Sequence, residues 1–174
     1  VLGPLAAAEC WTGPDLAHQD FIRSGLAIEV KTSLAKRHAR LRIANEKQLD
    51  ERCHENLLLA YFNLDESMAH GVSLPMVIER VRALAAGDPS ASCILNDRLF
   101  ACGYLDVPAP IYDRNRWRAG DARYFRVEGE FPRLTDANLP AGVGDISYSI
   151  IADDLGSYEI GYDDVAGLVE AAGG

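Results

Sequence analysis

Apolar and polar positions in the first third of the chain follow the patterns of β-strands. Strands are expected at residues 18–23, 26–33, 38–43 and 56–64. In the third of these, apolar residues alternate with arginines, which indicates a strand with one buried face. The fourth is almost continuously apolar, as is typical of a strand covered on both faces. Between them, residues 45–51 are predicted to form a short helix capped by Asn45.

Two helices are predicted in the middle of the chain. The first can be capped by Ser73, has Pro75 in its first turn and ends at Gly87. Its apolar residues recur on one face, so this face should pack against other elements. The second helix is expected at residues 91–102, before Gly103.

The last part of the chain carries weaker signals. Residues 103–117 are rich in proline and tyrosine and indicate a loop, whereas residues 122–134 should be a strand followed by a turn. Another strand is expected at 144–151, and residues 167–174 indicate a weak helix or a tail. This order of elements predicts an α/β (α+β) fold with a mixed central sheet flanked by helices.

The composition is that of a folded protein. Of the 174 residues, 48% are hydrophobic and 25% are charged, which suits one domain with a substantial core and at most a small appendage. The apolar runs are shorter than a membrane span, so no membrane partner is expected. Because the chain starts at Val1 without a leader pattern, we expect its true N-terminus to lie upstream.

The cysteines give no sign of a metal or disulfide framework. They are Cys10, Cys53, Cys93 and Cys102. No two of them form a CxxC pair, and the histidines beside them lack the spacing of a zinc site. We therefore expect buried free thiols in a reducing cytoplasm.

Charge is unevenly distributed along the chain. The net charge of −9 argues against a protein that coats nucleic acid. A local basic surface is compatible with this charge, since residues 31–42 contain five cations and no Asp or Glu. Residues 104–126, with several Tyr and Arg, are an alternative surface for nucleic acid or an ordinary packed segment.

The hairpin over residues 18–33 gathers charged side chains on one face. If Ser24 and Gly25 are the central residues of its turn, Asp20 pairs with Glu29, and Lys31 lies on the same face two residues further on. The apolar residues then point to the other face, which we expect to be the core. These are Phe21, Leu26, Ile28 and Val30.

Two opposed carboxylates need compensation, because like charges directly across a strand pair are destabilising. Lys31 can neutralise one of them, one can hold a proton, or a divalent cation such as Mg²⁺ can bridge both. The last arrangement, with a lysine beside the metal, suits phosphodiester hydrolysis. The same three charges also occur on ordinary solvent-facing hairpins, so the pattern alone leaves both interpretations open.

This arrangement resembles the PD-(D/E)XK nuclease superfamily, in which an acidic residue and an ExK or DxK tripeptide on adjoining strands bind the metal. Asp20, Glu29 and Lys31 match these positions, and Gln19 stands where the motif has proline. The resemblance implies a restriction-endonuclease-like core over residues 1–104 and a C-terminal strand and loop extension over residues 105–174.

A closer similarity is to an uncharacterised bacterial family assigned to that superfamily. The matching segments include WTG, HQDF, LAIEVKT, RIANEKQL and LPAGVGDISYSI, in this order, and the similarity covers about residues 11–160. It implies that Gln48 joins the site, although a solvated position for Gln48 is an equal alternative. The helix glutamate of many members would lie upstream of Val1, and Glu9 is too close to Trp11 to replace it.

The resemblance implies a DNA endonuclease that depends on Mg²⁺ or Mn²⁺, acts in the cytoplasm and belongs to a restriction or phage-defence system. The residues expected to contact DNA are His18, Lys36, Arg37, Arg40 and Arg42. The sequence alone favours an ordinary hydrogen-bonding surface histidine at position 18. The competing hypotheses are an inactive nuclease-like subunit of a larger complex, which binds DNA or is structural, and an acidic protein-interaction domain. Partner subunits and a homodimer are both open.

Overall fold

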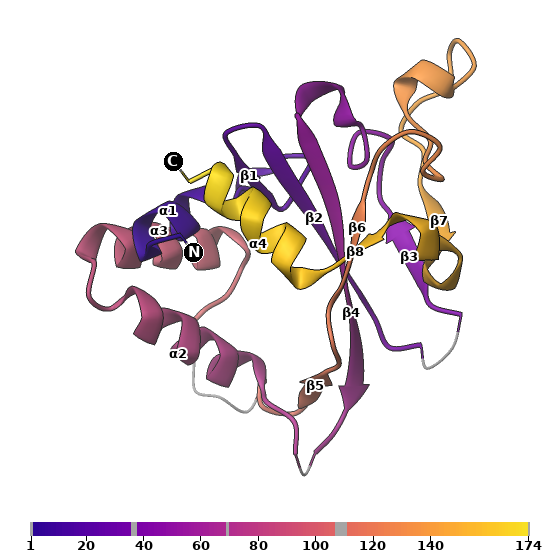
Figure 1. The fold of residues 1–174 in the computed structure, drawn as a ribbon. Coiled ribbons are helices and arrows are strands. Elements are labelled where there is room, and N and C mark those ends of the chain that lie inside the picture. The colour runs from indigo at the N-terminus through magenta and orange to yellow at the C-terminus, as the bar shows by residue number, and fades with distance from the viewer. Residues whose placement is uncertain (1, 36–37, 69, 107–110, 174) are drawn as a thin grey trace.

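The computed structural model describes residues 2–35, 38–68, 70–106 and 111–173. Among these residues, six strands form a mixed central sheet with the path β1-β2-β4-β6-β8, and β5 pairs with β4 beside that path (Figure 1). The strands are β1 (Phe21–Arg23), β2 (Leu26–Ser33), β4 (Asn56–Glu66), β5 (Trp117–Ala119), β6 (Arg123–Arg126) and β8 (Glu159–Ile160). The expected fold class, with a mixed sheet flanked by helices, is confirmed.

The predicted hairpin is present with the predicted register. In β1 and β2, Phe21 lies opposite Ile28 and Arg23 opposite Leu26. The two turn residues have positive φ, 42° at Ser24 and 80° at Gly25. Positive φ at both central positions is what a type I′ two-residue hairpin turn requires, so this local sequence determines which residues face each other across the hairpin.

β4 is the central strand and runs parallel to β2. On its other side it pairs antiparallel with β6 and, further along, with β5. Leu57 and Leu59 lie in the larger apolar cluster, whereas Leu58 belongs to a cluster with α4 (Tyr162–Ala171). The strand is therefore covered on both faces, as its continuous apolar run predicted.

The connection from β2 to β4 contains β3 (Arg40–Ile43), which pairs with β7 (Tyr148–Ile151) in a second, two-stranded sheet. Leu41, Ile43 and Ile150 of this small sheet belong to the same apolar cluster as Ala27 of β2. Ala27 and Glu29 are two residues apart and share one face of the strand. The expectation that only the opposite face of the hairpin is core is therefore wrong, because the face that carries Glu29 is buried as well.

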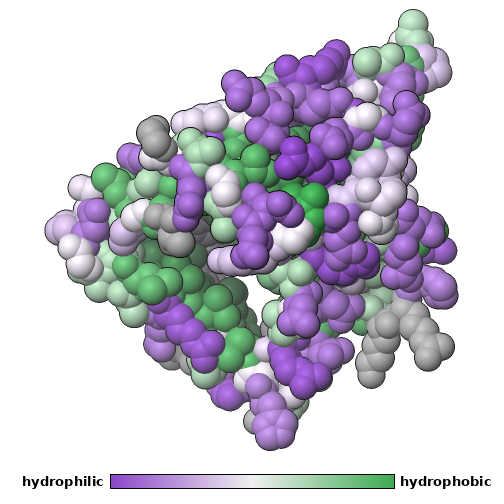
Figure 2. Space-filling view, in the orientation of Figure 1, coloured by the Kyte–Doolittle hydropathy of each residue, from purple (hydrophilic) through white to green (hydrophobic). Residues whose placement is uncertain are grey.

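Three helices pack together on the other side of the central sheet from β3 and β7 (Figure 1). They are α1 (Pro4–Cys10), α2 (Leu74–Ala85) and α3 (Pro89–Ala101). The predicted helices after Ser73 and near residues 91–102 are confirmed, and Asp88 caps the second by accepting from two backbone N–H groups. Figure 2 shows an apolar hollow between α2 and the other two helices, a groove of about 590 Å³ lined by Trp11, Val77, Val81 and others.

Two local expectations are wrong. Residues 45–50 form turns followed by a 3₁₀ helix at Glu51–Cys53, not a short helix over 45–51. The side chain of Asn45 accepts from the N–H of Lys47, and that of Asp50 from the N–H of Arg52, and such local bonds compete with helix formation. The cysteines are free, but Cys10 is buried and the other three are exposed.

The last third of the chain is built into the same sheet. β6, β8 and the covering helix α4 all come from it, so residues 105–174 contribute directly to the core. The division into a core at 1–104 and an extension at 105–174 stays a prediction. No helix in the described ranges combines the length and the apolar character needed to cross a membrane.

Candidate active site

Asp20 lies immediately before β1 and is held from two sides. The N–H groups of Thr12 and Gly13 donate to its carbonyl oxygen at 2.8 and 3.0 Å. Its carboxylate Oδ2 accepts a hydrogen bond from the N–H of Val30 on β2, at 2.8 Å. The carboxylate thus takes the place of the next backbone acceptor of β1, and this bond fixes it next to Glu29.

Glu29 is a buried carboxyl group paired with an ammonium. Its side chain is 2% exposed, and that of Lys31 is 14% exposed. The Lys31 Nζ lies 2.5 Å from Oε1 of Glu29. Because an unpaired buried charge is strongly destabilising, this contact is what allows an acidic residue to occupy the core face of β2.

The environment of Glu29 also shifts its protonation. Burial raises the pKa of Glu29 from 4.5 to about 7, against the attraction of Lys31, which lowers it. The negative charge of nearby Asp20 adds to the increase in this pKa. Of the three compensations considered for the opposed carboxylates, the structure shows the contact with Lys31, and the raised pKa of Glu29 favours protonation of the same group.

Gln48 reaches this group from the turn at residues 45–50. Its side-chain Oε1 accepts one hydrogen bond from Nζ of Lys31 at 3.1 Å and another from the N–H of Ala44 at 2.8 Å. Gln48 was expected on a helix, but the turn presents it to the same ammonium. Its side chain is therefore part of the polar cluster around Lys31.

Glu9 does not reach the cluster. It lies on α1, and its Oε2 is 4.0 Å from a guanidinium nitrogen of Arg23, at the turn end of the hairpin. Arg23 also donates to the carbonyl of Ala172 in the C-terminal segment. These contacts give Glu9 a role in joining α1 to the hairpin.

The two arginines of β3 that were expected to contact nucleic acid lie apart from this cluster. Arg40 and Arg42 are exposed on β3, while the alternate residues Leu41 and Ile43 are buried against the central sheet. Their side chains therefore point away from the hairpin face that carries Lys31. His18 is exposed on the segment before Asp20, and residues 36–37 lie outside the described residues.

Two residues that sequence reasoning did not assign to the site hold it together. Gly13 packs against Asp20 so closely that an added Cβ would lie 2.9 Å from Oδ1 of that carboxylate. Gln19, 4% exposed, contacts the turn that carries Gln48. The WTG and HQDF segments flagged both positions by similarity, but the contacts join residues far apart in sequence.

The hairpin offers a metal ion two carboxylates. No group of three or more His, Cys, Asp or Glu side chains that could hold a metal occurs among the residues that the structure describes. Mg²⁺ does not require one, since it commonly binds one or two carboxylates and completes its shell with water and phosphate oxygens. Asp20 and Glu29 supply the hard oxygen ligands that Mg²⁺ and Mn²⁺ prefer, so they fit either ion once Glu29 is ionised.

Comparison with known proteins assigns most of the chain to one family. A family model described as "Putative PD-(D/E)XK family member, (DUF4420)" matches residues 1–153, which include the hairpin, the turn at 45–50 and both sheets up to β7. Searches of curated proteins and of solved structures gave no match.

Proposed function

The chain belongs to this PD-(D/E)XK family, and from that premise we propose that it is a metal-dependent DNA endonuclease. The observation that carries the proposal is the contact of Lys31 with both Glu29 and Gln48, beside Asp20. Stability alone is a weak reason for a buried ion pair, because apolar side chains of similar volume often make a protein equally stable. Its place at the family motif supports a chemical role.

Each residue has a distinct task in the proposed reaction. Asp20 and Glu29 would hold Mg²⁺ or Mn²⁺, and an ion bound there supplies charge to a phosphoryl oxygen and lowers the pKa of a water molecule. Lys31 has three N–H donors, of which Glu29 and Gln48 take two. The third can orient the attacking water or offset negative charge on the phosphate in the transition state.

The biological setting is proposed from the sequence similarity. It is a restriction or phage-defence system in the bacterial cytoplasm, with DNA as substrate. A homodimer or partner subunits would complete the DNA-binding surface, because Arg40 and Arg42 are the only Lys or Arg residues on the two strands of the small sheet.

A second candidate is an inactive nuclease-like module that is a structural or DNA-binding subunit of a larger complex. It is favoured by the contact between Lys31 and Glu29, because the ammonium already offsets the charge of the carboxylate without a metal ion. In that case the Asp20, Glu29 and Lys31 cluster would stabilise the hairpin and would bind no metal at physiological concentration.

Metal binding and cleavage by carboxylate variants separate the two candidates. We expect wild type to bind Mn²⁺ in calorimetry and to nick plasmid DNA with Mg²⁺ or Mn²⁺. Asp20→Asn and Glu29→Gln should each abolish metal binding and DNA cleavage, because each removes one of the two carboxylate ligands. Lys47→Ala is the matched control, since it removes an exposed charge beside Gln48. Unchanged metal affinity in both carboxylate variants would sink the proposed site.

A further inference from the structure

Gln19 is a buried amide directly before Asp20. Its side chain is among the few buried polar groups, at 4% exposure. A buried amide is costly unless its donors and acceptor are satisfied, so its partners indicate why it is there. A proline side chain, as in the family motif, could make none of these hydrogen bonds.

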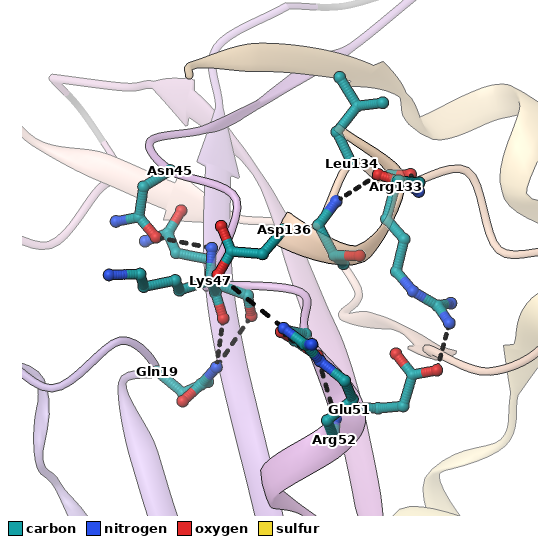
Figure 3. A network of polar contacts seen from close by, with 12 residues as sticks. Gln19, Asn45, Lys47, Glu51, Arg52, Arg133, Leu134 and Asp136 are labelled. Atoms are coloured by element: carbon teal, nitrogen blue, oxygen red, sulfur yellow. Dashed lines mark hydrogen bonds and ion pairs between the residues drawn. The ribbon is translucent and has the colours of Figure 1, made fainter. Parts of the chain in front are cut away.

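The partners of Gln19 lie on the segment that carries Gln48. The side-chain Nε2 donates to the carbonyl oxygens of Lys47, at 2.9 Å, and of Gln48, at 3.2 Å (Figure 3). The Oε1 of Gln19 lies 3.3 Å from Nε2 of His54. Burial lowers the pKa of His54, which favours the neutral imidazole, and a neutral ring with its proton on Nε2 donates to this oxygen.

The orientation of the Gln19 amide follows from these partners. Carbonyl oxygens only accept, so the NH₂ end must face Lys47 and Gln48 and the oxygen must face His54. The carbonyl of Lys47 also accepts from the N–H of Asp50, at 3.3 Å, so Gln19 is its second donor.

The same turn is held from the opposite side by the C-terminal half of the chain. The buried carboxylate of Glu46 accepts from the N–H groups of Ile146, at 3.0 Å, and of Asp145, at 3.4 Å. Further along, Glu51 pairs with Arg133 (Figure 3). The segment at residues 45–53 is thus fixed between the hairpin and the loops around β7, and Gln19 is its contact from the Asp20 side.

A continuous chain of contacts links Gln19 to the ammonium. Gln19 holds the backbone of Gln48, and the side chain of Gln48 then accepts from both Ala44 and Lys31. We propose that Gln19 is a positioning residue that sets Gln48 against Lys31 and so aligns the turn with the hairpin. This inference rests on the proposed nuclease function only for its effect on rate.

The kinetic test uses Gln19→Met, which keeps the size of the side chain and removes its hydrogen bonds. We expect kcat to fall about tenfold or more with little change in KM, since a small misplacement of a reacting group costs rate. Gln48→Ala should have a similar effect, and the double variant should be no worse than the more severe single one. Additive losses from the two substitutions would overturn the proposed linkage.

A second test does not depend on cleavage. Hydrogen exchange at the Ala44 amide reports the bond to Gln48, so Gln19→Met and Gln48→Ala should both accelerate it. Asn63→Asp is the matched control, because the side-chain amide of Asn63 also donates a hydrogen bond to a distant backbone carbonyl, that of Ala35. Gln19→Glu serves if Gln19→Met does not fold, since its carboxylate cannot donate to the two carbonyls.

The two tests separate the failure of each proposal. If wild type cleaves no DNA with any divalent ion, the nuclease function fails, and exchange at Ala44 still decides the role of Gln19. Unchanged exchange in the Gln19 variants would overturn the positioning role even if the protein proves to be an active nuclease.

Discussion

At the scale of single residues, the central feature is a carboxyl group placed where an apolar residue would be expected. Glu29 occupies the core face of β2 next to Leu59 of β4, and it is tolerated there because Lys31 pairs with it. Its spacing to Asp20 and Lys31 was predictable, since a two-residue turn fixes which residues face each other. Its burial was not, because it results from β3 and β7 packing over that face.

Glu29 should make the protein less stable as pH rises. Its pKa is raised from 4.5 to about 7 by burial, so the folded state binds this proton more tightly than the unfolded chain does. The contribution is fully present below pH 4.5 and is lost as pH rises through 7. The expected loss in the free energy of unfolding is on the order of 3 kcal/mol.

Urea denaturation across this pH range measures the effect, with Glu29→Gln as the test variant. The variant should lose this part of the pH dependence, whereas Glu55→Gln, at an exposed position, should keep it. An identical pH dependence in wild type and Glu29→Gln would show that Glu29 is ionised throughout.

Gly13 should be required for the position of Asp20. An added Cβ would lie 2.9 Å from Oδ1 of that carboxylate, so Gly13→Ala must displace it. We expect Mn²⁺ affinity to fall by roughly tenfold, a loss of about 1.4 kcal/mol. Calorimetry would measure this, with Gly87→Ala as control, since an added Cβ there meets nothing within 4 Å. Equal affinities in the two variants would mean that Asp20 does not bind the ion.

At the scale of elements, local sequence correctly predicted the hairpin and the helices that follow Ser73 and Asp88. It did not predict the turn at residues 45–50. The register of β1 and β2 depends on the two residues Ser24 and Gly25, which lie next to each other. The turn depends on Gln19 and on Glu46, whose partners lie 28 and about 100 residues away. Contacts between residues so far apart in sequence produce no periodic pattern, so the turn could not be predicted from the sequence.

The hairpin turn should tolerate a change at one of its two central residues only. Gly25 has φ of 80°, and an added Cβ would lie 3.1 Å from the side chain of Glu55. Gly25→Ala should lower the free energy of unfolding by about 1–2 kcal/mol. Ser24→Gly should change it by less than about 0.5 kcal/mol, because relief of the left-handed backbone offsets the added freedom of the unfolded chain. Urea denaturation showing equal effects would contradict the turn geometry.

At the scale of the whole molecule, charge and fold set how DNA could approach. The net charge of −9 repels DNA at low salt, so binding must depend on a local surface. Arg40 and Arg42 form an exposed pair on β3, on the other side of that strand from the central sheet. The sequence predicted that these arginines alternate with buried residues. The direction in which they point relative to Lys31 depends on how the two sheets pack, which the sequence pattern does not contain.

DNA binding should become less dependent on salt when Arg40 and Arg42 are removed. Each lost phosphate contact should reduce the slope of log K against log salt by about one unit, so Arg40→Ala with Arg42→Ala should reduce it by about two. Fluorescence anisotropy over a salt series would measure it. Arg82→Ala is the control, because its guanidinium already pairs with Asp106. An unchanged slope in the double variant would place the DNA surface elsewhere.

The measurement that tests the central claim most directly is metal-dependent DNA cleavage by wild type and by Lys31→Ala, at metal concentrations that saturate both proteins. If Asp20 and Glu29 hold the ion and Lys31 acts on the water or phosphate, wild-type cleavage should require Mg²⁺ or Mn²⁺. The variant should still bind the ion but cleave about a hundredfold more slowly. Cleavage that persists in EDTA, or equal rates in the two proteins, would contradict the account.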